Sequence, residues 1–383
     1  MVRLVRLGKS MHAVAARLHV DPSTVCFWVA RAKADRLDRI DFSDRKSGRA
    51  WNRTASHVEQ RIVALRRSLR EESILGEYGA RAIEAVLNTE MPNAPSQATL
   101  NRVLARLGLQ DGVRRVRRPA PPPGWYLPQV AAGHAELDCF DFIEDLKIAD
   151  GPLVDALTAK SLHGALPDAW MMSGKSAKRT ASCLRKRWRR EGAPGYAQFD
   201  NDTVFQGAHQ FPHAVGRISR LCLQLNVVPV FVPPLEHGMQ NSIESLNALW
   251  QVKVWQRHRV GSMRELQRRS DEYLAARRLR TQALAETAPQ RRPLPKGFRL
   301  NLHAPLRGLI IFIRRTDETG HVHLLGQRFA VSPNWSHRLV RCEVDFDHHY
   351  IRCFALRRAA PTEQPLLTTI PYQRPDKPFK GEL

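Results

Sequence analysis

Hydrophobic positions near the start of the chain repeat every three to four residues, which predicts short amphipathic helices. Apolar residues at positions 14, 15 and 18 form one stripe, and those at 25, 28 and 29 form a second. Between them the sequence Asp-Pro-Ser-Thr, at 21–24, supplies a helix N-cap followed by proline at the first helical position. We therefore expect a helix-turn-helix over 1–36, with Ser23 and Thr24 at the start of the second helix, although a plain helical hairpin fits equally.

A second helical unit is expected over 56–110, after a polar linker at 37–55. Ser96 can cap a helix whose leucines and valine at 100, 103, 104 and 107 keep helical spacing, and Gly108 ends it. The opposite face carries side chains able to reach phosphates and base edges, namely Gln97, Asn101, Arg102 and Arg106. A solvated helix face would have the same composition.

Strands and helices alternate over 131–259, which predicts a mixed α/β domain. The expected strands are 135–143, 152–158, 168–172, 196–200 and 227–232, and the expected helices are 175–190, 211–225 and 238–255. The basic run 185–190 ends one of these helices and would also suit a solvated surface. A polar helical connector at 260–296 precedes a run of short strands over 297–383, which predicts a small all-β barrel.

The net charge of the chain indicates which class of molecule it binds. The 383 residues contain 60 Lys and Arg against 37 Asp and Glu, a net charge of +23. The expected partner is therefore a polyanion, above all nucleic acid such as double-stranded DNA, and an anionic membrane surface is the rival. No apolar run approaches the ~18 residues of a membrane-spanning helix. The six cysteines lack metal-binding spacing, and the charged N-terminus does not resemble a secretory signal, so we expect a cytoplasmic protein.

A basic, proline-rich linker is expected at 111–130. Four arginines, Arg114, Arg115, Arg117 and Arg118, precede a stiff stretch rich in proline. Such an arm can follow DNA phosphates or lie in a minor groove. A charged spacer between domains is the alternative.

Three carboxylates stand in apolar surroundings where an unpaired charge is costly. Asp138 interrupts the strand 137–143, Asp200 ends the strand at 196–200, and Glu244 lies in the helix after the apolar run 227–232. Hard oxygen ligands without His or Cys suit Mg²⁺ or Mn²⁺, and two such ions can promote phosphoryl transfer. Asp141 is the substitute for Asp138, but three residues along a strand its side chain points to the opposite face.

The sequence resembles the retroviral-integrase-like D-D-E transposases of bacterial insertion sequences. The likeness lies in 136–140, in Phe-Asp-Asn-Asp-Thr-Val-Phe at 199–205, and in the proline-rich turn and helix start at 233–245. It implies an RNase H-like core with Asp138, Asp200 and Glu244 as catalytic and metal-binding triad. It also implies cleavage at the ends of a mobile DNA element, attack of the freed 3′-hydroxyl on target DNA, and at least a dimer on DNA.

Several features depart from the family pattern, among them the 44-position gap from Asp200 to Glu244 and Ser245 in place of a basic residue. Asp202 stands where the family has glycine, and Asn241-Ser242 replaces an Asn-Gly pair. These departures favour an alternative, a catalytically decayed or domesticated DNA-binding protein of the same fold. A nuclease that cuts without joining is a third interpretation. No Walker-type loop is present, so any ATP hydrolysis would need a separate helper ATPase.

Overall fold

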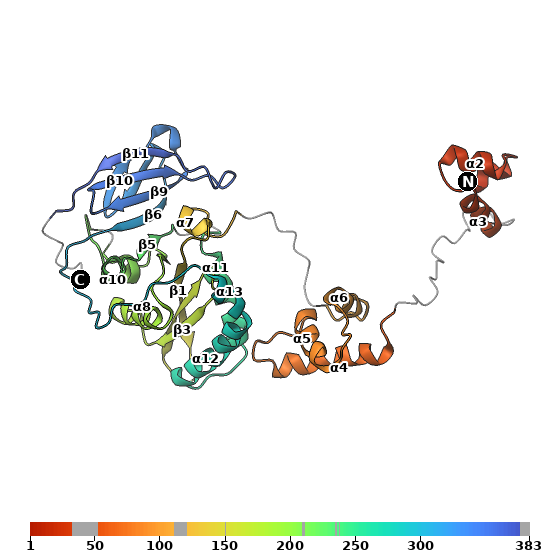
Figure 1. Cartoon of the computed structure of the whole chain (residues 1–383), viewed down its shortest axis with the longest axis horizontal. Coiled ribbons are helices and arrows are strands. Elements are labelled where there is room, and N and C mark those ends of the chain that lie inside the picture. Colours follow the sequence, from red (N-terminus) through yellow and green to blue (C-terminus); the bar gives the residue numbers. More distant parts are fainter. Residues whose placement is uncertain are drawn as a thin grey trace.

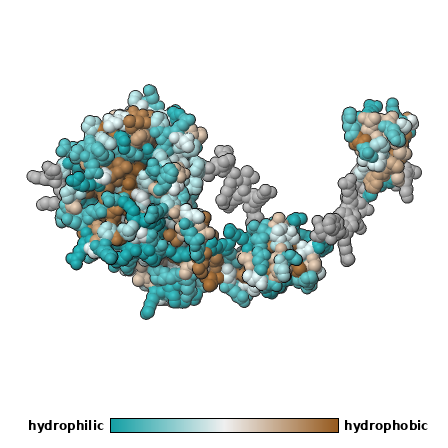
Figure 2. All heavy atoms as spheres, in the orientation of Figure 1, coloured by the Kyte–Doolittle hydropathy of each residue, from teal (hydrophilic) through white to brown (hydrophobic). Residues whose placement is uncertain are grey.

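The computed structural model describes residues 1–32, 53–110, 121–149, 151–208, 211–233, 236 and 238–375. Two small helical units come first along the chain, and a larger α/β body follows (Figure 1). Hydrophilic side chains cover most of the face shown in Figure 2. None of the helices in the described part of the chain is both long and apolar enough to cross a membrane.

The first unit has three helices packed on a small core. Their bounds are α1 Val2–Arg6, α2 Met11–Leu18 and α3 Pro22–Ala32. Ser10 caps α2 by accepting a hydrogen bond from the Ala13 amide, and Asp21 accepts one from the Ser23 amide at 2.8 Å. The two expected helices are therefore present, and the five-residue α1 packs beside them.

The second unit consists of α4 Ser56–Glu72, α5 Ala80–Glu90 and α6 Gln97–Arg106. Its core of eight buried residues includes Ile62, Ile83 and Leu100, and their helical spacing explains the pattern in the sequence. The unit contacts the body through the end of α4. Arg257 donates to the backbone oxygens of Ser73 and Glu71, both at 2.6 Å.

The body is built on a nine-stranded mixed sheet in the order β11-β10-β9-β6-β5-β4-β1-β2-β3. Strands β1, β2 and β3 form an antiparallel meander, whereas β4 and β5 run parallel to β1. Strands occur at all five positions expected between 131 and 259. They are β1 Leu137–Lys147, β2 Leu153–Ser161, β3 Pro167–Met172, β4 Tyr196–Phe199 and β5 Val228–Phe231.

Helices cover both faces of this sheet, so it lies at the centre of the body (Figure 1). One core packs against α8 Ala177–Glu191, α9 Thr203–Gln206 and α10 Arg217–Gln224. The other packs against α7 Pro128–Ala131, α11 Asn241–Trp250 and α12 Met263–Arg280. A π-helical turn, Gln251–Trp255, continues α11, and α13 Gln282–Thr287 follows α12.

The C-terminal segment differs from the predicted separate barrel. Its strands β6 Leu309–Arg315, β9 Leu339–Asp345, β10 Tyr350–Ala355 and β11 Leu366–Pro371 extend the central sheet. The hairpin of β7 His321–Leu324 and β8 Gln327–Ala330 forms a separate two-stranded sheet. The cause is the pairing of β6 with β5, Val230 with Ile311 and Phe231 with Phe312, which buries alternate β6 residues in both cores.

Candidate active site

Side chains of β1 alternate between the two faces of the sheet, and this alternation determines which carboxylate of β1 lies on the side of α11. Phe140 packs in the core beside α8, whereas Leu137, Cys139 and Ile143 pack in the core beside α11. Asp138 therefore shares the α8 face with Phe140, and Asp141 lies on the α11 face. Because Glu244 belongs to α11, Asp141 is the β1 carboxylate on the same side as Glu244.

Strand β4 brings Asp200 to the same place. In the parallel register, Cys139 is paired with Gln198, and Asp141 and Asp200 each follow two residues later. The Gln198 side chain donates to the Met239 backbone oxygen at 3.1 Å, which marks the α11 side of the sheet. Asp200, two positions on, therefore points to the same side.

Asp141 is a half-buried carboxylate in a negative environment. Burial raises its pKa to about 7, and the charges of Asp200 and Glu244 contribute to the rise. Asn247 on α11 donates to its Oδ2 at 2.7 Å, and the Phe142 amide donates to Oδ1 at 2.9 Å. The anion is therefore held in one orientation, while its full ionisation at neutral pH requires further positive charge.

The charged form of Asp200 is also disfavoured relative to its protonated form. Burial raises its pKa, and the neighbouring charges of Asp202 and Glu144 add to the effect. Its Oδ1 accepts a hydrogen bond from the Asp202 amide at 2.9 Å. Two carboxylates with raised pKa values at neighbouring positions of adjacent strands are typical of a functional site.

Glu244 lies in the first turn of α11 and is exposed, beside the buried Ile243 and Leu246. Its side chain has no hydrogen-bond or ion-pair partner among the described residues. Lys160 helps to fix this helix by donating to the Ser242 backbone oxygen at 3.2 Å. Across the described ranges, no three His, Cys, Asp or Glu side chains are arranged as a metal-ion site.

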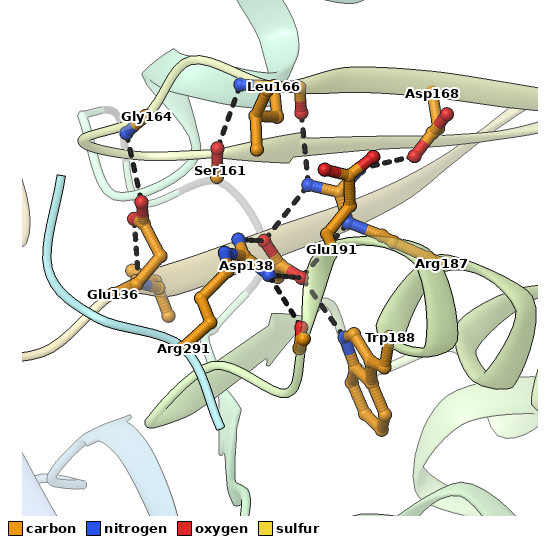
Figure 3. Close-up of polar contacts among 12 residues, drawn as sticks. Glu136, Asp138, Ser161, Gly164, Leu166, Asp168, Arg187, Trp188, Glu191 and Arg291 are labelled. Carbon is orange, nitrogen blue, oxygen red and sulfur yellow. Dashed lines mark hydrogen bonds and ion pairs between the residues drawn. The ribbon is translucent and has the colours of Figure 1, made fainter. Parts of the chain in front are cut away.

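Asp138, expected in the triad, is instead the centre of a buried ionic network on the other face (Figure 3). Arg187 donates to both of its oxygens, at 2.9 and 3.0 Å, and Arg291 does so at 2.5 and 3.2 Å. The Trp188 indole adds a bond at 3.0 Å. The structure therefore does not bring Asp138 to Asp200 and Glu244, because strand alternation turns it toward α8.

Asp202, which stands where the transposases that the sequence resembles have glycine, has a compensating partner. Lys175 contacts Asp202 Oδ2 at 2.5 Å and Glu144 Oε1 at 2.8 Å. The Lys175 bond and the Val204 amide lower the pKa of Asp202 despite its partial burial. Its φ of −57° suits any L-residue, so the turn needs no glycine. No sequence motif had marked Lys175.

The predicted DNA-binding residues occupy three settings. Ser23 and Thr24 lie in the first turn of α3, where Ser23 is exposed. The exposed side of α6 carries Gln97, Asn101, Arg102 and Arg106, and Arg106 forms an ion pair with Glu59. Arg114, Arg115, Arg117 and Arg118 lie outside the described residues.

Comparison with known proteins gives only distant likenesses. No protein-family model matches the chain, and no curated protein matches it. The catalytic core domain of BIV integrase is similar with 16% identity and a TM-score of 0.27, over 38% of this chain and 82% of that one. A chain of the simian T-cell lymphotropic virus intasome in complex with PP2A regulatory subunit B56 gamma has 11% identity and a TM-score of 0.33, over 76% and 93%. At these values, the function has to be inferred from the residues of this chain.

Proposed function

We propose that this protein is a transposase or integrase-type enzyme that cuts and joins DNA strands with Asp141, Asp200 and Glu244. The observation that carries the proposal is the electrostatic environment of Asp141. Burial and the charges of Asp200 and Glu244 raise its pKa to about 7, so the Asp141 carboxylate lacks a compensating positive charge. A divalent cation would supply that charge.

The donor chemistry fits Mg²⁺ or Mn²⁺. Asp141 and Asp200 follow paired positions on adjacent parallel strands, and the exposed Glu244 can turn toward them from α11. All three offer hard carboxylate oxygens, the ligands that Mg²⁺ and Mn²⁺ prefer. Bound there, one or two such ions would stabilise the attacking and leaving oxygens of a phosphodiester displacement.

The rest of the molecule supports a DNA substrate. The net charge of +23 favours a polyanion, and two helical units precede the catalytic body. In this proposal α3 and α6 bind the ends of a mobile element, and a dimer or larger assembly pairs two ends. The mixed sheet with helices on both faces suits the RNase H-like core that the sequence resemblance implies.

The test is cleavage of DNA from the flanks of the gene by the full-length protein in Mg²⁺ or Mn²⁺. Asp141→Asn, Asp200→Asn and Glu244→Gln should each abolish nicking while leaving DNA binding intact. Asp138→Asn, assayed at low temperature where its folded fraction can be measured, should nick in proportion to that fraction. Full activity of Asp141→Asn would refute the assignment.

A DNA-binding protein without catalysis is the second candidate. It is favoured by the absence of an assembled three-ligand metal group among the described residues. In that case the wild-type protein would bind flanking DNA in a salt-sensitive manner but would not nick it in either metal. Mg²⁺ would then leave its thermal stability unchanged.

A further inference from the structure

Arg314, at the end of β6, is a partly buried cation that has no acidic partner among the described residues. Its guanidinium donates to the backbone oxygens of Phe231 at 3.2 Å and Ile313 at 2.8 Å, and to Asn201 Oδ1 at 3.1 Å. It also lies 5.0 Å from the centre of the Phe312 ring. By contrast, the buried Arg187 is neutralised by two aspartates. Within the described part of the chain its hydrogen-bond acceptors are neutral oxygens, so no carboxylate there compensates its positive charge.

This charge persists at neutral pH. Burial lowers the pKa of Arg314 to about 10, which still leaves the guanidinium protonated. Partial burial removes some of the water that would solvate this charge, and no counter-ion replaces it within the described residues. The environment of Arg314 is therefore suited to an anion from outside the protein.

A cavity of about 380 Å³ opens beside Arg314. Its lining also includes Asn201, Gln206 and His323, together with the turn at 324–326. The volume lies within the range of about 300–1,000 Å³ typical of small-ligand sites. The C-terminal segment supplies Arg314, His323 and the turn, so its incorporation into the sheet creates this cavity.

Gln206 provides an independent sign of a missing ligand. The residue is only 5% exposed, and its Oε1 has no hydrogen-bond partner among the described residues. A buried amide without a partner is unfavourable by about 1–3 kcal/mol. Rotation of the amide would present its NH₂ group to the same space, so Gln206 can donate to an anion or accept from a ligand amine.

The cavity lies at the end of β4 that carries Asp200, on the α9 side of the sheet. Asn201 directly follows Asp200, and Gln206 ends the short helix α9 that begins three residues after Asp200. We propose that the cavity binds a phosphodiester group of the DNA strand next to the one at the carboxylates, with Arg314 as its charge partner and Gln206 as a hydrogen-bonding partner. This inference rests on the proposed function and adds a substrate-positioning site to it. A guanidinium beside an amide is well suited to a phosphate and opposes a cation.

The test measures DNA binding in EDTA, so that catalysis plays no part. A labelled duplex from the flanks of the gene is titrated at several salt concentrations with wild type, Gln206→Leu, Arg314→Lys and Arg314→Gln. Arg307→Gln is the control, because Arg307 is an exposed arginine just before the same strand. Thermal unfolding of each variant reports whether it folds.

Arg314→Gln should weaken binding about ten-fold or more and reduce the salt slope by about 0.9, the contribution of one duplex phosphate. Gln206→Leu should weaken binding with little change of slope. Because it removes an unsatisfied buried group, it should fold at least as stably as wild type. Arg314→Lys should keep the slope and lose affinity through poorer geometry.

Wild-type affinity and slope in folded Gln206→Leu and Arg314→Gln would overturn the proposal. A second result would also overturn it. Inorganic phosphate would raise the melting temperature of wild type but not of Arg314→Gln, while the salt dependence of DNA binding would be the same in both proteins. That result would assign the cavity to a free anion. Failure of the wild-type protein to cleave DNA would refute the proposed function but would leave these binding results standing, so the two failures are distinguishable.

Discussion

Asn247 donates a hydrogen bond from its side-chain amide to Asp141 Oδ2 at 2.7 Å, and its own Oδ1 accepts one from Thr158 at 2.7 Å. Asn247 lies one helical turn after Glu244, so the same face of α11 carries Glu244 and the hydrogen bond to β1. Thr158 also donates to the Asp141 backbone oxygen at 3.1 Å. The two bonds of Asn247 hold α11 against β1 and β2, and the third bond joins β2 to β1 at the same place.

Replacing Asn247 should change the acidity of Asp141. The Asn247 bond stabilises the carboxylate and lowers its pKa, so Asn247→Ala should raise that pKa further. The acid limb of the pH–cleavage profile should move to higher pH, and cleavage at pH 7 should fall by roughly ten-fold or more. The exposed Ser245 on the same helix supplies the control, Ser245→Ala. An unshifted acid limb with reduced stability would show that Asn247 acts only in packing.

The raised carboxylate pKa values predict how stability depends on pH without metal. The pKa of Asp141 is about 7 in the folded protein against ~3.9 in the unfolded chain, so the folded state binds more protons in this window. The free energy of unfolding in EDTA should therefore fall between about pH 4 and 7, by roughly 2–4 kcal/mol from Asp141 alone.

Mg²⁺ should reverse this loss. A metal competes with protons for the carboxylates, so the Mg²⁺-induced rise in melting temperature should be larger at pH 8 than at pH 5.5. Asp141→Asn should flatten the EDTA profile and abolish the Mg²⁺ response. Scanning fluorimetry across the pH series measures both effects. Equal responses to Mg²⁺ in wild type and Asp141→Asn would place the metal elsewhere.

The sequence was sufficient to predict the five strands between 131 and 259, but not the short helix α9, the strand β11 or the face of β1 that forms the proposed site. Apolar runs marked every strand between 131 and 259, because fully covered strands are apolar on both sides. The same property concealed which of Asp138 and Asp141 meets α11. Which aspartate meets α11 depends on which helix covers which face of the sheet. The helix that covers the Asp138 face ends in the basic run containing Arg187 and Trp188, which resembled a solvated surface although both side chains are fully buried.

Two other features required tertiary information. The strands after residue 308 have the lengths and turns of a small barrel, and only the pairing of β6 with β5 adds them to the central sheet. Arg314 lacked any motif, because its significance comes from Asn201 and Phe231, which are distant in sequence. Lys175 likewise becomes informative only beside Asp202.

Lys175 should compensate the charge that replaces the family glycine. Lys175→Met leaves Asp202 and Glu144 unpaired and removes a positive charge that lowers the pKa of Asp200. Cleavage should decrease most at low pH, where Asp200 is then more protonated. In an Asp202→Asn background the stability loss should be smaller by about 0.5–1 kcal/mol, the usual coupling of a partly exposed ion pair. Additive losses in a double-mutant cycle would show that the pair does not interact.

Asp138 should be a determinant of stability and not of chemistry. Its pKa is lowered by the Arg187 and Arg291 charges against the opposing effect of burial, so its contribution is present above the unfolded pKa of ~3.9 and is lost as the pH falls below that value. Asp138→Asn leaves two guanidinium groups partly unpaired and should reduce the free energy of unfolding at pH 7 by about 3–5 kcal/mol. Glu318→Gln, in the exposed turn after β6, should stay within about 0.5 kcal/mol of wild type. Urea denaturation measures both variants, and abolished cleavage in an Asp138→Asn protein of unchanged stability would return Asp138 to the catalytic triad.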